Sequence, residues 1–113
     1  MGKLEGKVAW ITGAGSGIGE ATAHAMAKEG AIVALTGRRK EPLDEVAHAI
    51  EKAGGKALVE PGDVMDKAMA PAVVARILKS AGRLDVLVNN AGTNVTARTF
   101  AVLTPENLDY VIQ

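Results

Sequence analysis

Four closely spaced glycines near the start of the chain are the clearest candidates for a chemical role. They follow an apolar run and precede a helical pattern, and they are Gly13, Gly15, Gly17 and Gly19. A strand, a glycine turn and a helix in that order bring unpaired backbone N–H groups and the positive end of a helix dipole to one place. Phosphate binds at such a place, and glycine leaves the approach open because it has no side chain. The spacing therefore predicts a phosphate-binding turn, with a tight turn for close helix packing as the structural alternative.

Four apolar runs could supply the strands that position this turn. They are residues 8–11, 31–35, 56–60 and 85–88, of which the third is the weakest. Helical patterns separate these runs, and such alternation indicates βαβ units with a parallel sheet. With right-handed crossovers, the expected fold is α/β, a Rossmann-like doubly wound parallel sheet with strand order 3-2-1-4.

Apolar periodicity also predicts which face of each helix is buried. For the first helix, which Gly30 ends, the predicted face is Ile18, Ala21, Ala25 and Met26. For the second, with Pro42 in its first turn, the predicted face is Leu43, Val46, Ala47 and Ile50. The third helix lies between Asp66 and Ser80 and buries Met69, Val73 and Ile77. Pro71 either delays the start of that helix or bends it.

The last part of the chain is expected to be less regular. Residues 93–102 are predicted to be a loop, and Thr104 with Pro105 predicts the start of another helix. The fourth strand is then expected at the edge of the sheet, with its outer backbone groups unpaired. Because the last helix has barely begun at Gln113, we interpret residues 1–113 as a single nucleotide-binding domain that is truncated on its C-terminal side.

Composition excludes several classes of partner. The chain has 13 basic and 13 acidic residues, so no overall field attracts nucleic acid or an anionic membrane. No apolar run approaches the ~20 residues that span a bilayer, and the first residues lack the apolar core of a signal peptide. With no cysteine and no cluster of carboxylates and histidines, no metal site is expected. We therefore expect a cytoplasmic protein without nucleic-acid, membrane or metal partners.

Two motifs at a consistent separation resemble a known family, the short-chain dehydrogenases/reductases. Residues Thr12–Gly19 are similar to the TGxxxGIG cofactor motif of that family, and Asn89–Gly92 are similar to its NNAG motif. Asp63–Val64 stands where the family has an acidic residue beside the adenine, and residues 85–88 match the usual lead into NNAG. The resemblance covers nearly the whole chain.

The resemblance implies a dinucleotide site with contributions from several segments. The backbone of residues 16–19 would hold the pyrophosphate, Asp63 with Val64 would flank the adenine, and residues 90–91 would line the ribose. Asn89 resembles a structural amide that joins neighbouring strands. The complete implied set is Gly13, Gly15, Ser16, Gly17, Ile18, Gly19, Arg38, Arg39, Asp63, Val64, Asn90, Ala91 and Gly92.

The end of the second strand bears on the choice between NAD and NADP. An NAD site has an acidic acceptor there for the ribose 2′-hydroxyl, whereas an NADP site has cations for the 2′-phosphate. This sequence has Gly37 at the family's acidic position, followed by Arg38 and Arg39, whose forked donors suit phosphate oxygens. NADP, as NADPH, is therefore the expected cofactor, and NAD is the alternative. A solvated basic loop that continues into Lys40 is the structural alternative.

The residues that perform the family's reaction are expected outside this sequence. By resemblance, the chemistry needs a Ser, a Tyr and a Lys, with the last two spaced YxxxK far downstream of NNAG. Tyr110 is the only tyrosine of the chain, and we interpret it as a packing residue because it lies too near NNAG. We therefore expect no catalytic residue in this chain and no activity from the 113 residues alone.

The function implied is that of an NAD(P)-dependent oxidoreductase, which transfers a hydride between NADP(H) and a small-molecule alcohol or carbonyl substrate. The complete protein is expected to be a homo-oligomer, a dimer or a tetramer. Two alternatives from other classes stay open. One is a non-catalytic nucleotide-binding module, such as a pseudoenzyme or one part of a split protein. The other is a methyltransferase with a similar glycine turn, which Arg38, Arg39 and the NNAG motif disfavour.

Overall fold

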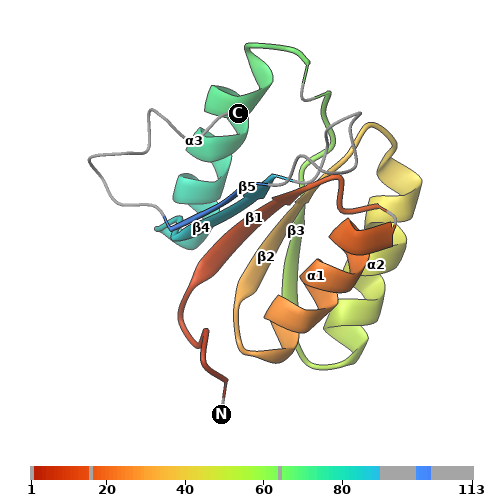
Figure 1. Ribbon diagram of the computed structural model, residues 1–113, viewed down its shortest axis with the longest axis vertical. Coiled ribbons are helices and arrows are strands. Elements are labelled where there is room, and N and C mark those ends of the chain that lie inside the picture. The colour runs from red at the N-terminus through yellow and green to blue at the C-terminus, as the bar shows by residue number, and fades with distance from the viewer. Residues whose placement is uncertain (1, 16, 64, 90–98, 103–113) are drawn as a thin grey trace.

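A computed structural model describes residues 2–15, 17–63, 65–89 and 99–102 of the chain. In these residues, three helices and five strands follow one another along the chain (Figure 1). The elements are β1 (Val8–Thr12), α1 (Gly17–Lys28), β2 (Ile32–Thr36), α2 (Lys40–Lys52), β3 (Lys56–Val59), α3 (Met69–Ala81), β4 (Val86–Asn89) and β5 (Thr99–Val102).

The described strands form one sheet in the order β3-β2-β1-β4-β5. The pairs β1–β2, β2–β3 and β1–β4 are all parallel, so the predicted order 3-2-1-4 is confirmed. β1 lies at the centre, with Val8 opposite Ile32 and Thr12 opposite Thr36 in the register with β2. A buried parallel strand is apolar on both faces, which explains why the strands appear in the sequence as continuous apolar runs.

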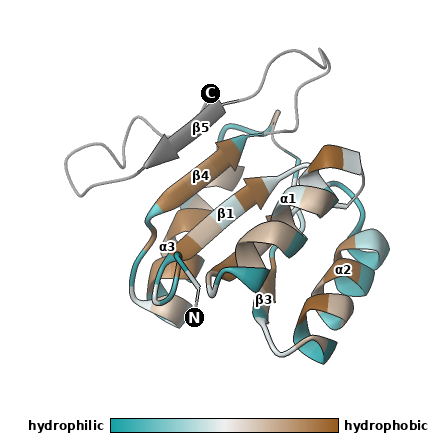
Figure 2. Ribbon diagram, turned by 60° about the horizontal axis from the view of Figure 1, so that its bottom comes forward, coloured by the Kyte–Doolittle hydropathy of each residue, from teal (hydrophilic) through white to brown (hydrophobic). Residues whose placement is uncertain are grey.

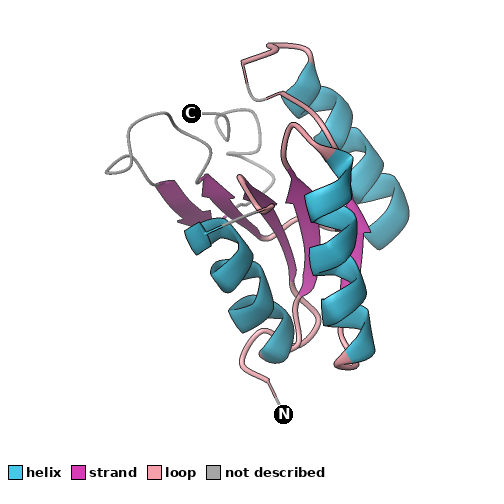
Figure 3. Ribbon diagram, turned by 90° about the vertical axis from the view of Figure 1, so that its right-hand side faces the viewer, coloured by secondary structure: helices cyan, strands magenta, loops and turns pink. Residues whose placement is uncertain are grey.

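Helices cover both faces of this sheet, and the residues of β1 alternate between them (Figures 1 and 3). Ala9 and Ile11 pack on the side of α1 and α2, in a cluster that includes Met26 of α1. Val8 and Trp10 pack on the side of α3. The two apolar layers hold the central strand in place, and its C-terminal end leads directly into the glycine turn.

Helices α2 and α3 bury the faces that periodicity predicts. Figure 2 shows hydrophilic residues on the outer side of α2, opposite its four buried apolar residues, Leu43, Val46, Ala47 and Ile50. In α3, Val73 and Ile77 are buried and Met69 is partly buried against the same cluster. Pro71 is the third residue of α3, where a missing N–H costs no intrahelical hydrogen bond. Of the two possibilities for Pro71, the late helix start is therefore correct.

For α1, the prediction of which face is buried is wrong. Its buried residues are Gly19, Ala23 and Met26, whereas Ile18 is half exposed, and Ala21 and Ala25 are exposed. Alanines occur on every side of this helix, so apolar periodicity hardly distinguishes one face from another. The structure selects the face whose small residues let α1 lie close to the sheet, and Met26 is the one predicted residue on that face.

The loop predicted for residues 93–102 is wrong for its last four residues. β5 pairs antiparallel with β4, with Val86 opposite Val102 and Asn89 opposite Thr99. β4 is consequently an internal strand of the described sheet and not its edge, and its apolar side chains are buried. A strand of four residues is too short to show a clear periodicity, and its partner strand supplies the backbone hydrogen bonds that define it. The predicted helix at Thr104 lies outside the described residues.

Candidate nucleotide-binding site

The glycine turn lies at the point where the direction of winding of the sheet reverses. The chain goes from β1 outward to β2 and β3, and then returns through α3 to β4 on the other side of β1. Ligands of open α/β sheets bind outside the carboxyl ends of the strands at such a reversal. The carboxyl ends of β1 and β4 are therefore the candidate site (Figure 1).

The turn has backbone angles that favour glycine and leaves space beside the start of α1. Gly13 has φ +63° and Gly17 has φ +59°, both in the left-handed region. A Cβ added to Gly17 would have no heavy atom within 4 Å, so this side of the turn is open. The first N–H groups of α1 have no intrahelical acceptor, and the helix dipole favours negative charge there. The turn thus fits the phosphates of a dinucleotide.

Close packing places the turn beside the end of β2 and the first turn of α2. The backbone N–H of Ala14 donates to the carbonyl of Thr36 over 3.1 Å. A Cβ added to Gly15 would lie 3.1 Å from Cβ of Pro42, and one added to Gly37 would lie 4.0 Å from the backbone nitrogen of Gly15. The glycines at 15 and 37 therefore leave room for the side chains of Pro42 and Leu43 at the start of α2. Consequently, the residue after Gly37 begins next to the glycine turn.

Two of the three cations that follow β2 have a carboxylate partner. Nε of Arg38 lies 3.7 Å from Oδ1 of Asp63, and both side chains are largely exposed, at 71% and 50%. Nζ of Lys40 lies 2.8 Å from Oδ2 of Asp44, one helical turn further along α2. Within the described part of the chain, Arg39 has no such partner. The sequence places Arg38 and Asp63 in one site but does not predict that they pair with each other.

A buried hydrogen-bonded chain joins β1, β2 and the end of β3 beneath this site. Nε1 of Trp10 donates to Oγ1 of Thr36 over 2.8 Å, and that hydroxyl donates to the carbonyl of Glu60 over 2.8 Å. Arg76 of α3 donates to the Glu60 carboxylate over 2.6 Å. Sequence reasoning missed this series of hydrogen bonds. The available signal was Trp10 itself, because an indole in a buried strand needs an acceptor for its N–H.

Asn89 joins β4 to β1, as the sequence interpretation of a structural amide implies. Oγ1 of Thr12 donates to Oδ1 of Asn89 over 2.9 Å at the carboxyl ends of the two strands. The other residues implied near this position, Asn90, Ala91 and Gly92, lie outside the described residues, as do Ser16, Val64 and Tyr110. The described members of the implied set are Gly13, Gly15, Gly17, Ile18, Gly19, Arg38, Arg39 and Asp63.

A different arrangement of polar groups lies at the amino ends of the strands. The Asp85 carboxylate, just before β4, accepts a hydrogen bond from the backbone N–H of Val8 over 2.9 Å. It also accepts two from the Arg83 guanidinium, each over 2.8 Å. The hydrogen bond from Arg83 is the largest cause that lowers the pKa of Asp85; partial burial opposes it, and the Val8 N–H adds to it. Asp85 thus fixes the entry of β1 beside β4.

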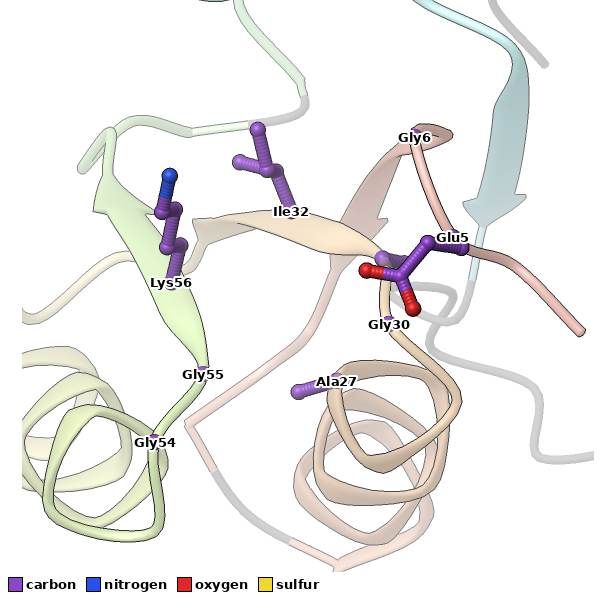
Figure 4. Close-up of a pocket in the computed structure, with 9 residues that line it drawn as sticks. Glu5, Gly6, Ala27, Gly30, Ile32, Gly54, Gly55 and Lys56 are labelled. Atoms are coloured by element: carbon purple, nitrogen blue, oxygen red, sulfur yellow. The ribbon is translucent and has the colours of Figure 1, made fainter. Parts of the chain in front are cut away.

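A pocket of about 300 Å³ also lies at the amino ends, away from the glycine turn. Its walls are the turn before β1, the α1–β2 connection and the α2–β3 connection. Figure 4 shows Glu5 and Lys56 on opposite sides of it, with Ile32 between them. Helix C-termini border this pocket, and their carbonyl dipoles disfavour phosphate. This pocket and the candidate site are therefore at opposite ends of the sheet, and the strand ends with the open glycine turn are the better candidate.

Within the residues that the structure describes, no helix is both long enough and apolar enough to cross a membrane. The same residues contain no group of three or more histidines and carboxylates arranged to hold a metal ion.

The fold and the position of the glycine turn define a Rossmann-like α/β domain. The family model of the short chain dehydrogenases matches residues 7–113, and the chain belongs to that family. The family assignment from the two sequence motifs is thus confirmed.

Curated relatives and solved structures extend this result. The chain is 42% identical over 112 residues to a 3beta-hydroxysteroid dehydrogenase of Mediterraneibacter gnavus, which covers 99% of this chain and 41% of that protein. It is 44% identical over 96 residues to a 7alpha-hydroxysteroid dehydrogenase of Clostridium sardiniense, which covers 84% and 37%. A metagenomic short-chain oxidoreductase solved in complex with NADP superposes with a TM-score of 0.77 at 43% identity, covering 80% and 41%. The chain spans about two fifths of the length of these relatives.

Proposed function

We propose that this chain is the dinucleotide-binding half of an NAD(P)-dependent oxidoreductase that transfers a hydride between NADP(H) and an alcohol or carbonyl substrate. The observation that carries the proposal is the open glycine turn at the carboxyl end of β1, where the sheet reverses its winding. When bound there, the cofactor supplies the hydride donor or acceptor. The chain's own residues bind and orient it.

The described residues divide into three roles in this proposal. The turn from Gly13 to Gly19 holds the pyrophosphate through backbone N–H groups at the start of α1. The bound dinucleotide shields from solvent the apolar side chain of Ile18, which is 50% exposed beside the turn. Asp63 lies beside the adenine, following the resemblance to the family. The roles of Ser16, Val64, Asn90, Ala91 and Gly92 stay predictions, because these residues lie outside the described part of the chain.

The proposed preference is for NADPH over NADH. It is supported by Arg38 and Arg39, which are exposed after β2, and by the packing of Gly37 against Gly15, which brings the start of this basic segment beside the phosphate-binding turn. A 43% identical relative was solved with NADP. Arg39, with no carboxylate partner in the described residues, is available for a 2′-phosphate. Since each charge-assisted hydrogen bond is worth about 1.5–3 kcal/mol, two arginines suffice for a measurable preference.

The residues that transfer the proton are proposed to lie outside these 113 residues, as the family resemblance implies. The protein translated from the complete reading frame should oxidise NADPH in the presence of a panel of carbonyl compounds. The 113-residue chain alone should give no loss of NADPH absorbance beyond a protein-free control. Turnover that follows the concentration of the short chain would show that its own residues perform the chemistry.

Calorimetry of the complete protein tests the cofactor assignment. Replacing both Arg38 and Arg39 by alanine should weaken NADPH binding by about tenfold or more and NADH binding by less than about threefold. The difference should shrink at high salt, because screening weakens charge–phosphate attraction. In a matched control, alanine replaces Lys28 and Lys52, which lie at the other end of the sheet. This variant loses the same number of positive charges. Equal loss for both cofactors would show that the arginines do not contact the 2′-phosphate, and no binding of either would refute the proposed function.

A further inference from the structure

The pairing of Arg38 with Asp63 bears directly on how strongly this site distinguishes NADPH from NADH. From it we infer that Asp63 is a specificity-determining residue that limits the preference for NADPH, so that the site accepts both cofactors. The inference rests on the proposed function and names a residue that sets how strongly the cofactor site distinguishes NADPH from NADH. It depends on three features of the described residues: the ion pair, the anchoring of the carboxylate, and the charge balance around the end of β2.

The ion pair engages one edge of the Arg38 guanidinium. Its Nε lies 3.7 Å from Oδ1 of Asp63. A guanidinium presents its donors as a planar fork, so the Nη nitrogens still have hydrogens for another anion. A 2′-phosphate on Arg38 would therefore share the guanidinium with Asp63, and would lie within range of its negative charge. NADH carries no 2′-phosphate, and its affinity does not include this repulsion.

Two hydrogen bonds from backbone N–H groups hold the Asp63 carboxylate near the Arg38 guanidinium. Oδ1 of Asp63 accepts a hydrogen bond from the backbone N–H of Met65 over 2.9 Å. The backbone N–H of Gly62 donates to the carbonyl of Gly37 over 2.9 Å, and this bond ties the segment after β3 to the residue that precedes Arg38. These two bonds oppose movement of the carboxylate away from Arg38 when a second anion arrives.

The charges around the end of β2 nearly cancel. Asp63 pairs with Arg38 and Asp44 pairs with Lys40, which leaves Arg39 as the one cation of the three without a carboxylate partner in the described residues. Three unpaired cations would attract a 2′-phosphate dianion strongly, whereas a run in which two of the three are paired with carboxylates attracts it less. The sequence predicts the three cations but not these two pairings.

The test measures the ratio of the dissociation constants for NADH and NADPH in the complete protein. Asp63→Asn keeps an oxygen acceptor for the Met65 N–H but removes the charge, and it should raise this ratio by about three- to tenfold at low ionic strength. Any adenine contact of Asp63 is common to both cofactors and cancels in the ratio. The increase should shrink in 1 M salt, because the Debye length is then about 3 Å.

The matched control is Glu51→Gln, which removes one exposed carboxylate at the opposite end of α2 and should leave the ratio within about twofold of the wild type. Asp63→Ser, whose hydroxyl can also accept from Met65, gives a second measurement if the asparagine variant does not fold. An unchanged or lower ratio in a folded Asp63 variant would overturn the inference. An equal increase in Glu51→Gln would also overturn it. If the wild-type protein binds neither cofactor, the proposed function fails and the inference fails with it.

Discussion

The two ends of the sheet use glycine in opposite ways. At the carboxyl ends, Gly17 has a positive φ at the start of α1 and has open space beside it. At the amino ends, Gly30, Gly54 and Gly82 have positive φ values just after α1, α2 and α3, where they end the helices. A parallel sheet with crossover helices places every helix N-terminus at one end and every C-terminus at the other. The same residue type therefore opens the proposed phosphate site at one end and caps helices at the other.

The polar contacts differ in the same way. At the carboxyl ends, side chains link neighbouring strands, through Thr12 with Asn89 and through Trp10 with Thr36. At the amino ends, the partly buried carboxylate of Asp85, which Arg83 holds, links β1 to the segment before β4. The carboxyl ends thus have hydrogen-bonded support, partly buried, beneath an open turn. This difference predicts that substitutions of the same kind have different consequences at the two ends.

Gly17→Ala and Gly54→Ala form the sharpest comparison and the largest expected effect. Both glycines have positive φ and no heavy atom within 4 Å of an added Cβ, so both substitutions introduce left-handed strain of about 1–2 kcal/mol. Only Gly17→Ala adds a methyl group at the proposed phosphate path. We expect it to weaken both cofactors by roughly 10- to 150-fold, the loss of about one charge-assisted hydrogen bond.

Calorimetry with NADPH and NADH measures this comparison, and thermal unfolding of both variants reports the shared strain. Gly54→Ala should bind both cofactors with wild-type affinity within about twofold. Comparable losses of affinity in the two variants would mean that the turn at Gly17 has no special part in binding.

Thr36→Val tests the buried support at the carboxyl ends. Valine has the shape of threonine but leaves the Trp10 N–H and the Glu60 carbonyl without their partner hydroxyl. We expect the free energy of unfolding to fall by about 2 kcal/mol, the cost of an unsatisfied buried donor. Chemical denaturation measures the change, and Thr36→Ser, which keeps the hydroxyl, is the control. The hydrogen-bonded chain would have no such role if the serine variant proved the less stable of the two.

Asp85→Asn tests the amino ends and has the smallest expected effect. The amide keeps an acceptor for the Val8 N–H but loses the charge that Arg83 holds, and because Arg83 is half exposed the loss should stay below about 1 kcal/mol. The folded state lowers the pKa of Asp85, chiefly through the hydrogen bond from Arg83. Its contribution is therefore full above the unfolded pKa of about 3.9 and is lost as the pH falls through the lower folded pKa. Denaturation of wild type and variant should differ at pH 6 and converge below about pH 4. A gap as large at pH 2.5 as at pH 6 would assign the effect to something other than this carboxylate.

The sequence by itself determined the elements from β1 to β4 and the order of their parallel strands. Apolar runs, left-handed glycines such as Gly30 and the helical faces of α2 and α3 depend on local periodicity and local backbone preference. The right-handed crossover then allows few arrangements of four strands. For the same reason, the glycine turn could be placed at the carboxyl end of β1, because its neighbours in the sequence are its neighbours in the fold.

The tertiary structure decided what depends on partners far apart in the chain. The buried face of α1 follows from which small residues let the helix approach the sheet, and alanines on every side hide that face from periodicity. β5 exists through its pairing with β4. The partners of Trp10 and Arg38 lie 26 and 25 residues away, and only the alignment of three strand ends brings them together. A sequence pattern records which groups are available, whereas the register of the strands fixes which of them neutralise one another.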